Sequence, residues 1–329
     1  MVISASPVTT RHVDIFNGDA DGLCALQQLR LAEPREAVRI TGVKRDIRLL
    51  ARAPAQDGDR ITVLDVSLDT NRDALLHALG TGAHLTWFDH HFAGDIPAHP
   101  NLEAHIDTSP EVCTAALVDA HLGGRFRAWA AAAAFGDNLP ALGRRLAAAC
   151  GLDEARTASL ARLGELLNYN AYGETVADLH YDPAELALRL RDYADPLDFI
   201  RDSEGVARLG AGHDEDMARA ARMRPERESA HGIVLLLPDE AWARRVSGPL
   251  ANDWASAHPG QALAVLSPNS RGNFTVSVRA PVSRPEGADA LCRQFPSGGG
   301  RKAAAGINDL PPAEYERFCA LFEAHFAPR

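Results

Sequence analysis

The sequence lacks the cysteine pattern of a disulfide-stabilised or thiolate-metal protein. Its five cysteines among 329 residues are scattered, odd in number and form no Cys-x-x-Cys pair, so neither structural disulfides nor a cysteine zinc site is expected. Long hydrophobic runs are missing too, since residues 128–135 and 233–237 fall far short of the ~20 needed to cross a bilayer. The first eleven residues carry no secretory pattern. We therefore expect a cytoplasmic protein without a membrane partner.

The sequence has fewer positively charged residues than negatively charged ones. Lys and Arg number 34 against 44 Asp and Glu, which makes a formal net charge of −10, and long-range repulsion disfavours general binding of polyanions. Such a chain holds a phosphate ester where metal ions or a local basic patch reverse the sign of the charge. The acidic surplus therefore raises the question of which carboxylates cluster around cations.

The pattern of apolar residues predicts an α/β protein of about two domains. Strands near 13–16, 38–43, 61–64, 84–88 and 102–106 alternate with helices, one of them near 47–53, which favours an N-terminal, mostly parallel sheet flanked by helices. Residues 111–223 are predicted to form a helical connector, and the charged, proline-interrupted stretch 222–229 a link between domains.

The remaining chain predicts a smaller C-terminal α/β domain. Its strands are expected near 232–237, 261–266 and 273–279, and its helices near 248–257, 287–294 and 312–324. We therefore divide the chain into an N-terminal domain over residues 1–222, with its helical part, and a smaller C-terminal domain over residues 223–329.

Acidic residues and histidines follow three of the N-terminal strands and the alanine-rich helix. They are Asp19, Asp21, Asp65, Asp89, His90, His91 and Asp137. Because ligands of open α/β sheets bind beyond the carboxyl ends of the strands, we expect these side chains to meet at one rim. In a strand, adjacent histidines would point to opposite faces, so the packing of one of them in the core is an alternative.

So many carboxylates at one rim would repel one another without a counter-charge. Oxygen-rich ligation with a few imidazoles suits Mn²⁺, and Mg²⁺ less well. Two such ions sharing a bridging carboxylate would clamp a phosphate and acidify a water for in-line attack. The pattern therefore predicts metal-assisted hydrolysis of a phosphoester.

The glycine-rich stretch 297–306 is the second informative segment. Its three consecutive glycines would let backbone N–H groups form an anion nest, with Arg301 and Lys302 adding positive charge at the start of a short helix. A flexible loop before an alanine-rich helix is the alternative. Arg279, at the end of a predicted strand, would donate two hydrogen bonds to a phosphate. The alternative is that it is an ordinary surface residue without a ligand.

Together these motifs resemble those of the DHH phosphoesterases with a DHH-associated C-terminal domain, a group that includes RecJ-type exonucleases and nanoRNases. The likeness spans nearly the whole chain and is carried by Asp19-Ala20-Asp21-Gly22, Asp65, Asp89-His90-His91, Asp137, the Asn-Tyr-Asn-Ala-Tyr-Gly segment within 167–173, and the glycine-rich residues 298–306.

The resemblance implies two Mn²⁺ ions, with Mg²⁺ as an alternative, and the metal ligands Asp19, Asp21, Asp65, Asp89, His90 and Asp137. It implies that Asp65 bridges the ions and that His91 contacts the scissile phosphate, which makes His91, Asp89 and Asp65 the expected catalytic residues. Substrate would be held by Arg279, Gly299, Gly300 and Arg301. The implied partner is a short single-stranded nucleic acid or a nucleotide, and a homodimer is left open.

Three positions depart from the family pattern. Ile15 stands where many relatives have a metal-binding histidine, Asn17 where RecJ-like members have aspartate, and Arg301 where the glycine-rich motif has histidine. One metal subsite therefore has a neutral or missing ligand. A metal-dependent phosphodiesterase acting on short oligonucleotides is the leading hypothesis. A small-nucleotide phosphatase of the 3′-phosphoadenosine 5′-phosphate type and a non-catalytic nucleic-acid- or protein-binding relative are the alternatives.

Overall fold

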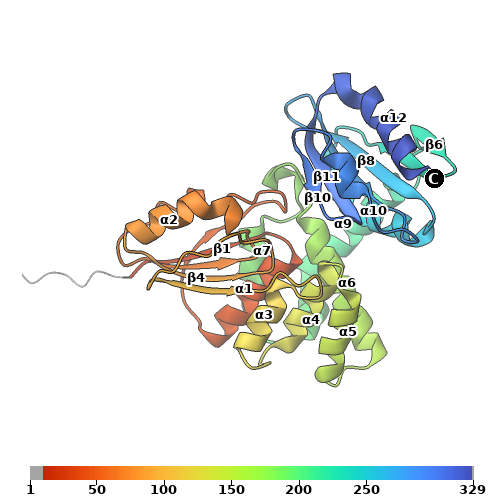
Figure 1. Ribbon diagram of the computed structural model, residues 1–329. Coiled ribbons are helices and arrows are strands. Elements are labelled where there is room, and N and C mark those ends of the chain that lie inside the picture. The colour runs from red at the N-terminus through yellow and green to blue at the C-terminus, as the bar shows by residue number, and fades with distance from the viewer. Residues whose placement is uncertain (1–9, 328–329) are drawn as a thin grey trace, which may run out of the picture. The chain divides into compact units, whose positions relative to one another are not determined.

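The computed structural model describes residues 10–327, and these divide into two units (Figure 1). The first unit takes the described residues up to Ala171 together with Tyr181–Arg208. The second takes Tyr172–His180 and the described residues from Leu209 onward, so that the chain enters it twice. The last crossing lies inside helix α9 (Glu204–Ala220). The domain boundary expected between residues 222 and 223 stays a prediction.

The first unit is built on five parallel strands in the order β2-β1-β3-β4-β5. They are β1 (His12–Phe16), β2 (Val38–Ile40), β3 (Arg60–Leu64), β4 (His84–Asp89) and β5 (Leu102–Ile106). The strand order reverses between β1 and β3, and this is the position at which open parallel sheets bind ligands beyond their carboxyl ends. The expected parallel sheet is confirmed.

Helices cover both faces of this sheet (Figure 1). One face packs against α2, whose Leu75 and Leu79 are buried with Val63 and Trp87 of the strands. The opposite face lies under α1 and α3, and further helices pack behind them. The helices of this unit are α1 (Ala20–Ala32), α2 (Arg72–Gly80), α3 (Thr114–His121), α4 (Arg127–Gly136), α5 (Pro140–Ala149), α6 (Glu154–Asn170), α7 (Pro183–Leu190) and α8 (Pro196–Asp202).

The segment after β2 differs from the expectation. The strand predicted over 38–43 ends at Ile40, and the helix predicted near 47–53 is one 3₁₀ turn, Leu50–Arg52. The side chain of Asn71 explains the shorter turn, because it donates to the Ile47 carbonyl at 2.7 Å and accepts from the Leu50 N–H at 3.3 Å. These backbone groups are therefore bonded to a side chain instead of extending a helix.

The second unit is a six-stranded mixed sheet in the order β10-β11-β9-β8-β7-β6, in which β7 and β8 are parallel and the other pairs antiparallel. The strands are β6 (Arg227–Ser229), β7 (Gly232–Leu236), β8 (Ala262–Pro268), β9 (Phe274–Arg279), β10 (Gly298–Gly300) and β11 (Ala304–Leu310). The helices are α10 (Ala241–Ala257), α11 (Ala288–Cys292) and α12 (Tyr315–Phe326). The expected smaller α/β part is confirmed.

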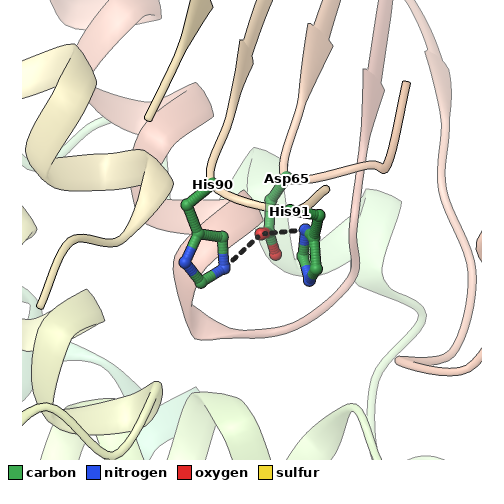
Figure 2. A group of neighbouring side chains, drawn as sticks. All are labelled: Asp65, His90 and His91. Carbon is green, nitrogen blue, oxygen red and sulfur yellow. Dashed lines mark ion pairs between the residues drawn. The ribbon is translucent and has the colours of Figure 1, made fainter. Parts of the chain in front are cut away.

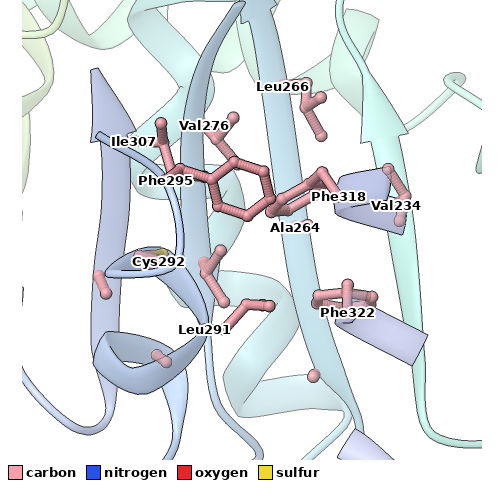
Figure 3. Close-up of a cluster of buried hydrophobic side chains, with 14 of the residues drawn as sticks. Val234, Ala264, Leu266, Val276, Leu291, Cys292, Phe295, Ile307, Phe318 and Phe322 are labelled. Carbon is pink, nitrogen blue, oxygen red and sulfur yellow. The ribbon is translucent and has the colours of Figure 1, made fainter. Parts of the chain in front are cut away.

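Alternate residues along these strands point to opposite faces of the sheet, and each face forms a separate hydrophobic core. Figure 3 shows Val234, Ala264 and Val276 on one face, packed against Phe295 and against Phe318 of α12. Their neighbours along the strands face α10 and form the second cluster, which includes Ile233, Leu263, Val265, Trp242 and Val246. The sheet is therefore buried on both sides.

Two boundaries in the second unit were predicted wrongly. The stretch 222–229 contains β6, because Arg227–Ser229 pairs with β7 in an antiparallel ladder. The helix expected near 248–257 begins at Ala241 and runs through Pro249, since its apolar residues Trp242 and Val246 belong to the buried cluster under the sheet. Within residues 10–327, no helix is both long enough and apolar enough to span a membrane.

Candidate functional site

The acidic residues and histidines that follow the strands of the first unit lie together at its carboxyl rim. Asp19 caps the start of α1 just after β1, Asp65 follows β3, Asp89 ends β4, and Asp137 caps the end of α4. Asp19, Asp21, Asp65 and Asp89 are each at most 2% exposed. Carboxylates are seldom buried to this degree without a partner of opposite charge.

His90 stands at the centre of this group. Its Nε2 atom lies 3.4 Å from Asp65 Oδ1, 3.7 Å from Asp137 Oδ2 and 3.9 Å from Asp21 Oδ2. Its Nδ1 atom lies 2.8 Å from the carbonyl oxygen of Val112, so Nδ1–H is the donor to that oxygen. This bond turns Nε2 toward the carboxylates, the orientation typical of a metal-binding histidine.

His91 points to the same carboxylate from the other side. Figure 2 shows both imidazoles turned toward Asp65, with His91 Nδ1 3.8 Å from its Oδ1. The alternative, in which one histidine would pack in the core, does not hold, because β4 ends at Asp89 and strand alternation no longer applies to the two residues that follow. His91 Nδ1 also lies 2.7 Å from Asp89 Oδ1, which fixes the ring.

Asp65 reaches this position through an unusual backbone conformation. Its φ angle is +57°, in the left-handed region that aspartate and asparagine adopt more readily than other non-glycine residues. Its N–H donates to the Phe88 carbonyl at 3.0 Å, and its Oδ1 accepts from the Thr114 hydroxyl at 3.2 Å. The turn after β3 therefore aims the carboxylate at the rim.

Asp21 is held by the start of α3. Its Oδ2 accepts the Thr114 N–H at 2.7 Å and its Oδ1 accepts the Ala115 N–H at 2.8 Å. The positive end of the helix dipole favours a carboxylate at this place. The sequence interpretation treated Thr114 as a turn residue, and no local signal indicated that it would contact residues 49 and 93 positions away.

Asp19 is bound to a cation from within the chain. Its Oδ1 accepts the N–H groups of Asp21 at 3.1 Å and Gly22 at 3.2 Å, which caps α1, and its Oδ2 forms an ion pair with Lys44. Burial alone would raise the pKa of Asp19, but the Lys44 ammonium outweighs it and holds that pKa below its ordinary value. Lys44 belongs to no motif, and the sequence analysis missed it.

The charged forms of Asp65 and Asp137 are disfavoured at this rim. Burial raises the pKa of Asp65 well above its ordinary value, and the charges of Asp19 and Asp21 raise it further. Burial also raises the pKa of Asp137. For His90, burial would lower the pKa, but hydrogen bonding to Asp65 and the nearby carboxylates raise it to about 10. The rim therefore has a strong electrostatic demand for a cation.

The donor atoms fit a divalent metal ion. Within residues 10–327, two groups have ligand atoms all within 4.8 Å of one another: Asp65, His90 and His91, and Asp21, His90 and Asp137. The fully buried Asp89 Oδ2 has no hydrogen-bond partner among the described residues, and such an atom is costly unless a cation binds there. Carboxylate oxygens and imidazole nitrogens are the ligand types that suit Mn²⁺.

Arg279, the first expected substrate-binding residue, ends β9 in the second unit. Its guanidinium donates to Asn252 Oδ1 at 3.4 Å, to Ser277 Oγ at 3.2 Å and to the Val278 carbonyl at 3.3 Å. Burial lowers the pKa of this guanidinium from its ordinary value. These acceptors are neutral, so they position the positive charge without cancelling it.

The glycine-rich stretch forms a hairpin, so the helix expected to start after the glycines is wrong. Gly298–Gly300 is the edge strand β10, paired with β11 so that Gly299 faces Gly306. Arg301 lies in the exposed turn, which its N–H and the Ala304 carbonyl close at 2.9 Å. A Cβ on Gly298 would lie 1.8 Å from the Cys292 carbonyl, so close packing explains that glycine.

Glycine at position 22 is required by the loop that carries Asp19 and Asp21. A Cβ there would lie 2.2 Å from the carbonyl oxygen of Asn17. We expect Gly22→Ala to shift the first turn of α1, destabilise the fold by about 1–3 kcal/mol and weaken Mn²⁺ binding, measured by chemical denaturation and calorimetric titration. Gly80→Ala, at the end of α2 with open space around it, is the control. Unchanged Mn²⁺ affinity in Gly22→Ala would contradict this role.

Comparison with known proteins identifies the fold. No family model and no curated protein matches the sequence. Among solved structures, RecJ in complex with Mn²⁺ from Thermus thermophilus matches with a TM-score of 0.65 and 22% sequence identity, over 95% of this chain and 51% of that chain. The present chain thus spans about half the length of that RecJ.

Two further structures match over nearly their whole length. Exonuclease RecJ bound to manganese has a TM-score of 0.57 and 21% identity, over 97% of this chain and 90% of that chain. The pGpG-specific phosphodiesterase PggH from Vibrio cholerae has a TM-score of 0.54 and 17% identity, over 96% and 100%. The chain therefore has a RecJ-like α/β fold, and its resemblance to the DHH phosphoesterases is confirmed at the level of the fold.

Proposed function

We propose that this chain is a metal-dependent phosphodiesterase that hydrolyses short single-stranded oligonucleotides or related nucleotides. The observation that carries the proposal is the convergence of Asp21, Asp65 and Asp137 on His90 Nε2, each within 4 Å. This group lies at the carboxyl rim of a sheet with a RecJ-like fold. Buried carboxylates around a fixed imidazole are suited to binding a divalent cation next to a phosphate ester.

The proposed ligands of the cation are Asp21, Asp65, His90 and Asp137, and the buried Asp89 is the next candidate. Mn²⁺ is the proposed ion, as in the two RecJ structures, and Mg²⁺ is the alternative. When bound, the ion supplies positive charge that polarises the phosphoryl group and activates a water molecule.

His90 and His91 have different proposed tasks because different partners hold their Nδ1 atoms. The Val112 carbonyl accepts from His90 Nδ1–H, which leaves the Nε2 lone pair for the cation. The Asp89 carboxylate accepts from His91 Nδ1–H at 2.7 Å. The His91 side chain is 40% exposed, so its Nε2 is the atom that can contact a phosphoryl oxygen of the substrate.

The second unit is proposed to bind the phosphates of the substrate. Arg279 keeps a positive charge among neutral acceptors, and a guanidinium is well matched to phosphate oxygens. Arg301 adds an exposed charge in the turn beside Gly299 and Gly300, whose strand lies at the edge of its sheet. In an edge strand, alternate backbone N–H groups point away from the neighbouring strand. The N–H of Gly298 already donates to the Phe295 carbonyl at 2.9 Å, so the N–H of Gly300 is the one proposed to donate to a phosphate.

Dinucleotides and short oligomers are the substrates proposed for the first test. One of the proteins with a similar fold is a phosphodiesterase specific for the dinucleotide pGpG, and two others are RecJ exonucleases. The likeness to these three proteins supports a test on both dinucleotides and short oligomers.

End-labelled dinucleotides and short DNA and RNA oligomers, incubated with Mn²⁺ or Mg²⁺, test the proposal. We expect release of mononucleotides with Mn²⁺, loss of this activity with a chelator, and loss of it in Asp89→Ala. The matched control is Asp73→Ala, which removes an exposed aspartate of α2 away from the rim.

The same assay separates the alternatives. Hydrolysis of phosphomonoesters without hydrolysis of dinucleotides would favour the small-nucleotide phosphatase. Intact oligomers at every Mn²⁺ concentration, with no Mn²⁺ bound by elemental analysis, would favour the non-catalytic relative and overturn the proposal.

A further inference from the structure

The β1 side of the rim already holds a positive charge that belongs to the chain. Lys44 Nζ forms an ion pair with Asp19 Oδ2 and donates to Asn168 Oδ1 at 3.0 Å. Its charge also acts on Asp137, whose pKa it lowers against the effect of burial. An ammonium in contact with carboxylate and amide oxygens has the surroundings that a bound metal cation would have.

The backbone holds Lys44 in this place. Its own N–H donates to the Ala171 carbonyl at 2.9 Å, and its carbonyl accepts from Asn17 Nδ2 at 3.4 Å. Asn168, which accepts from the ammonium, stands near the end of α6 and is 8% exposed. The segment after β2 is thus tied to the loop after β1 and to α6, both of which adjoin the rim.

The remaining residues on the β1 side are poor ligands for a second ion. Ile15 is fully buried in the apolar cluster under the sheet. Asn17 is neutral, and its Oδ1 already accepts the Asp19 N–H at 3.3 Å. Among residues 10–327, neither group of atoms spaced for a cation includes Asp19. A metal ion bound here would lie beside the Lys44 ammonium, which already forms an ion pair with Asp19.

Lysine is a rare residue in this sequence. Of the 34 Lys and Arg residues, two are lysines, Lys44 and Lys302. The ammonium of lysine is a compact point charge, whereas the guanidinium of arginine is a planar fork. Because the lysine ammonium is compact, it can occupy the position of a metal ion.

We infer that the Lys44 ammonium takes the place of the second divalent cation, so that the rim binds one divalent ion beside a built-in positive charge. This inference rests on the proposed function. The single ion would be held by Asp21, Asp65, His90 and Asp137, and Lys44 would neutralise Asp19. The expectation of two ions is thereby replaced by one ion and one ammonium.

The experiment counts ions in the folded, full-length protein. Calorimetric titration with Mn²⁺ gives the number of ions per chain, and electron paramagnetic resonance distinguishes an isolated Mn²⁺ from a spin-coupled pair. We expect one ion per chain and an isolated-ion spectrum for the wild type. Lys44→Met removes the charge at similar side-chain length, and we expect it to bind a second ion and to yield the signal of a coupled pair.

Two variants serve as controls. Lys44→Arg keeps the positive charge and is expected to bind one ion. Lys302→Met removes the other lysine, which is exposed in the second unit, and is also expected to bind one. If Lys44→Met fails to fold, as judged by circular dichroism, two ions or a spin-coupled pair in the wild type would still overturn the inference.

The outcomes separate the inference from the proposed function. Two ions in the wild type, or one ion in a folded Lys44→Met, would overturn the role of Lys44 while leaving a metal-dependent phosphodiesterase in place. No bound Mn²⁺ in any variant would instead overturn the proposed function.

Discussion

Asp65→Asn is expected to bind Mn²⁺ more than about 100-fold more weakly than the wild type and to lose the proposed hydrolysis. Changes to groups that merely support a ligand already cost about 10–100-fold in metal affinity, and Asp65 is proposed as a ligand itself. Its Oδ1 lies 3.4 Å from His90 Nε2 and 3.8 Å from His91 Nδ1, so losing its charge affects both imidazoles. Calorimetric titration and turnover of a dinucleotide measure the effect.

Asparagine is the informative substitution because the backbone of residue 65 has φ = +57°. Asparagine tolerates this conformation about as well as aspartate, whereas other side chains add strain. We therefore expect Asp65→Asn to fold and to melt no lower than the wild type, since like charges repel at this rim. A folded variant with wild-type Mn²⁺ affinity and turnover would contradict the proposed role.

Asp107→Asn is the matched control for this variant. Asp107 follows the neighbouring parallel strand β5, as Asp65 follows β3, but it is exposed and lies outside both groups of candidate ligands. We expect its Mn²⁺ affinity and its turnover to equal those of the wild type.

Asp178→Ala is expected to destabilise the second unit by about 1–3 kcal/mol, because it removes the main partner of the partly buried Arg244 guanidinium. The two side chains form a two-pronged ion pair, with distances of 2.8 Å and 3.1 Å, and are 9% and 18% exposed. Asp178 also accepts the backbone N–H groups of Glu174 and Thr175. Chemical denaturation followed by circular dichroism measures the loss.

The contribution of this pair depends on pH. Burial alone would raise the pKa of Asp178, but the hydrogen bonds from Arg244 and from the Glu174 N–H bring it below its ordinary value of 3.8. The unfolded chain therefore takes up the proton first as the pH falls. The stabilisation is complete above that ordinary value and is lost as the pH falls through the lower pKa of the folded state. Asp178→Asn should flatten this part of the stability curve.

Asp239→Asn provides the comparison within the same network. Asp239 pairs with the same guanidinium but is 70% exposed, and exposed ion pairs contribute about 0–1 kcal/mol. An equal loss of stability in Asp239→Asn and Asp178→Ala would show that burial is not the reason for the strength of the pair.

The patterns that were predicted correctly are those that depend on local order along the chain. Short apolar runs alternating with helical segments are enough to predict a parallel sheet. Such a sheet brings the ends of its strands to one edge wherever they stand in the sequence. This rule applies to Asp19, Asp65 and Asp89, which follow β1, β3 and β4 and lie at the same rim.

The prediction from the sequence was wrong for two segments. In each, the residue composition suggested one conformation, and hydrogen bonds to distant residues produced another. The run of three glycines and the alanines after it suggested a loop that opens a helix, but the glycines pair with β11 as an edge strand. The segment near 47–53 has the apolar spacing of a helix, yet Asn71, some twenty residues away, takes its backbone hydrogen bonds. In both cases a partner distant in the chain determines the conformation.

Local residue order therefore determined the class of fold and the edge of the sheet at which chemistry is proposed. Tertiary structure alone decided which groups complete that edge: the amide of Thr114 that holds Asp21, the Val112 carbonyl that turns His90, and the Lys44 ammonium bound to Asp19. The physical reason is that strand ends follow from the periodicity of the backbone. Hydrogen bonds and ion pairs between side chains depend on distances in space that no spacing along the chain encodes.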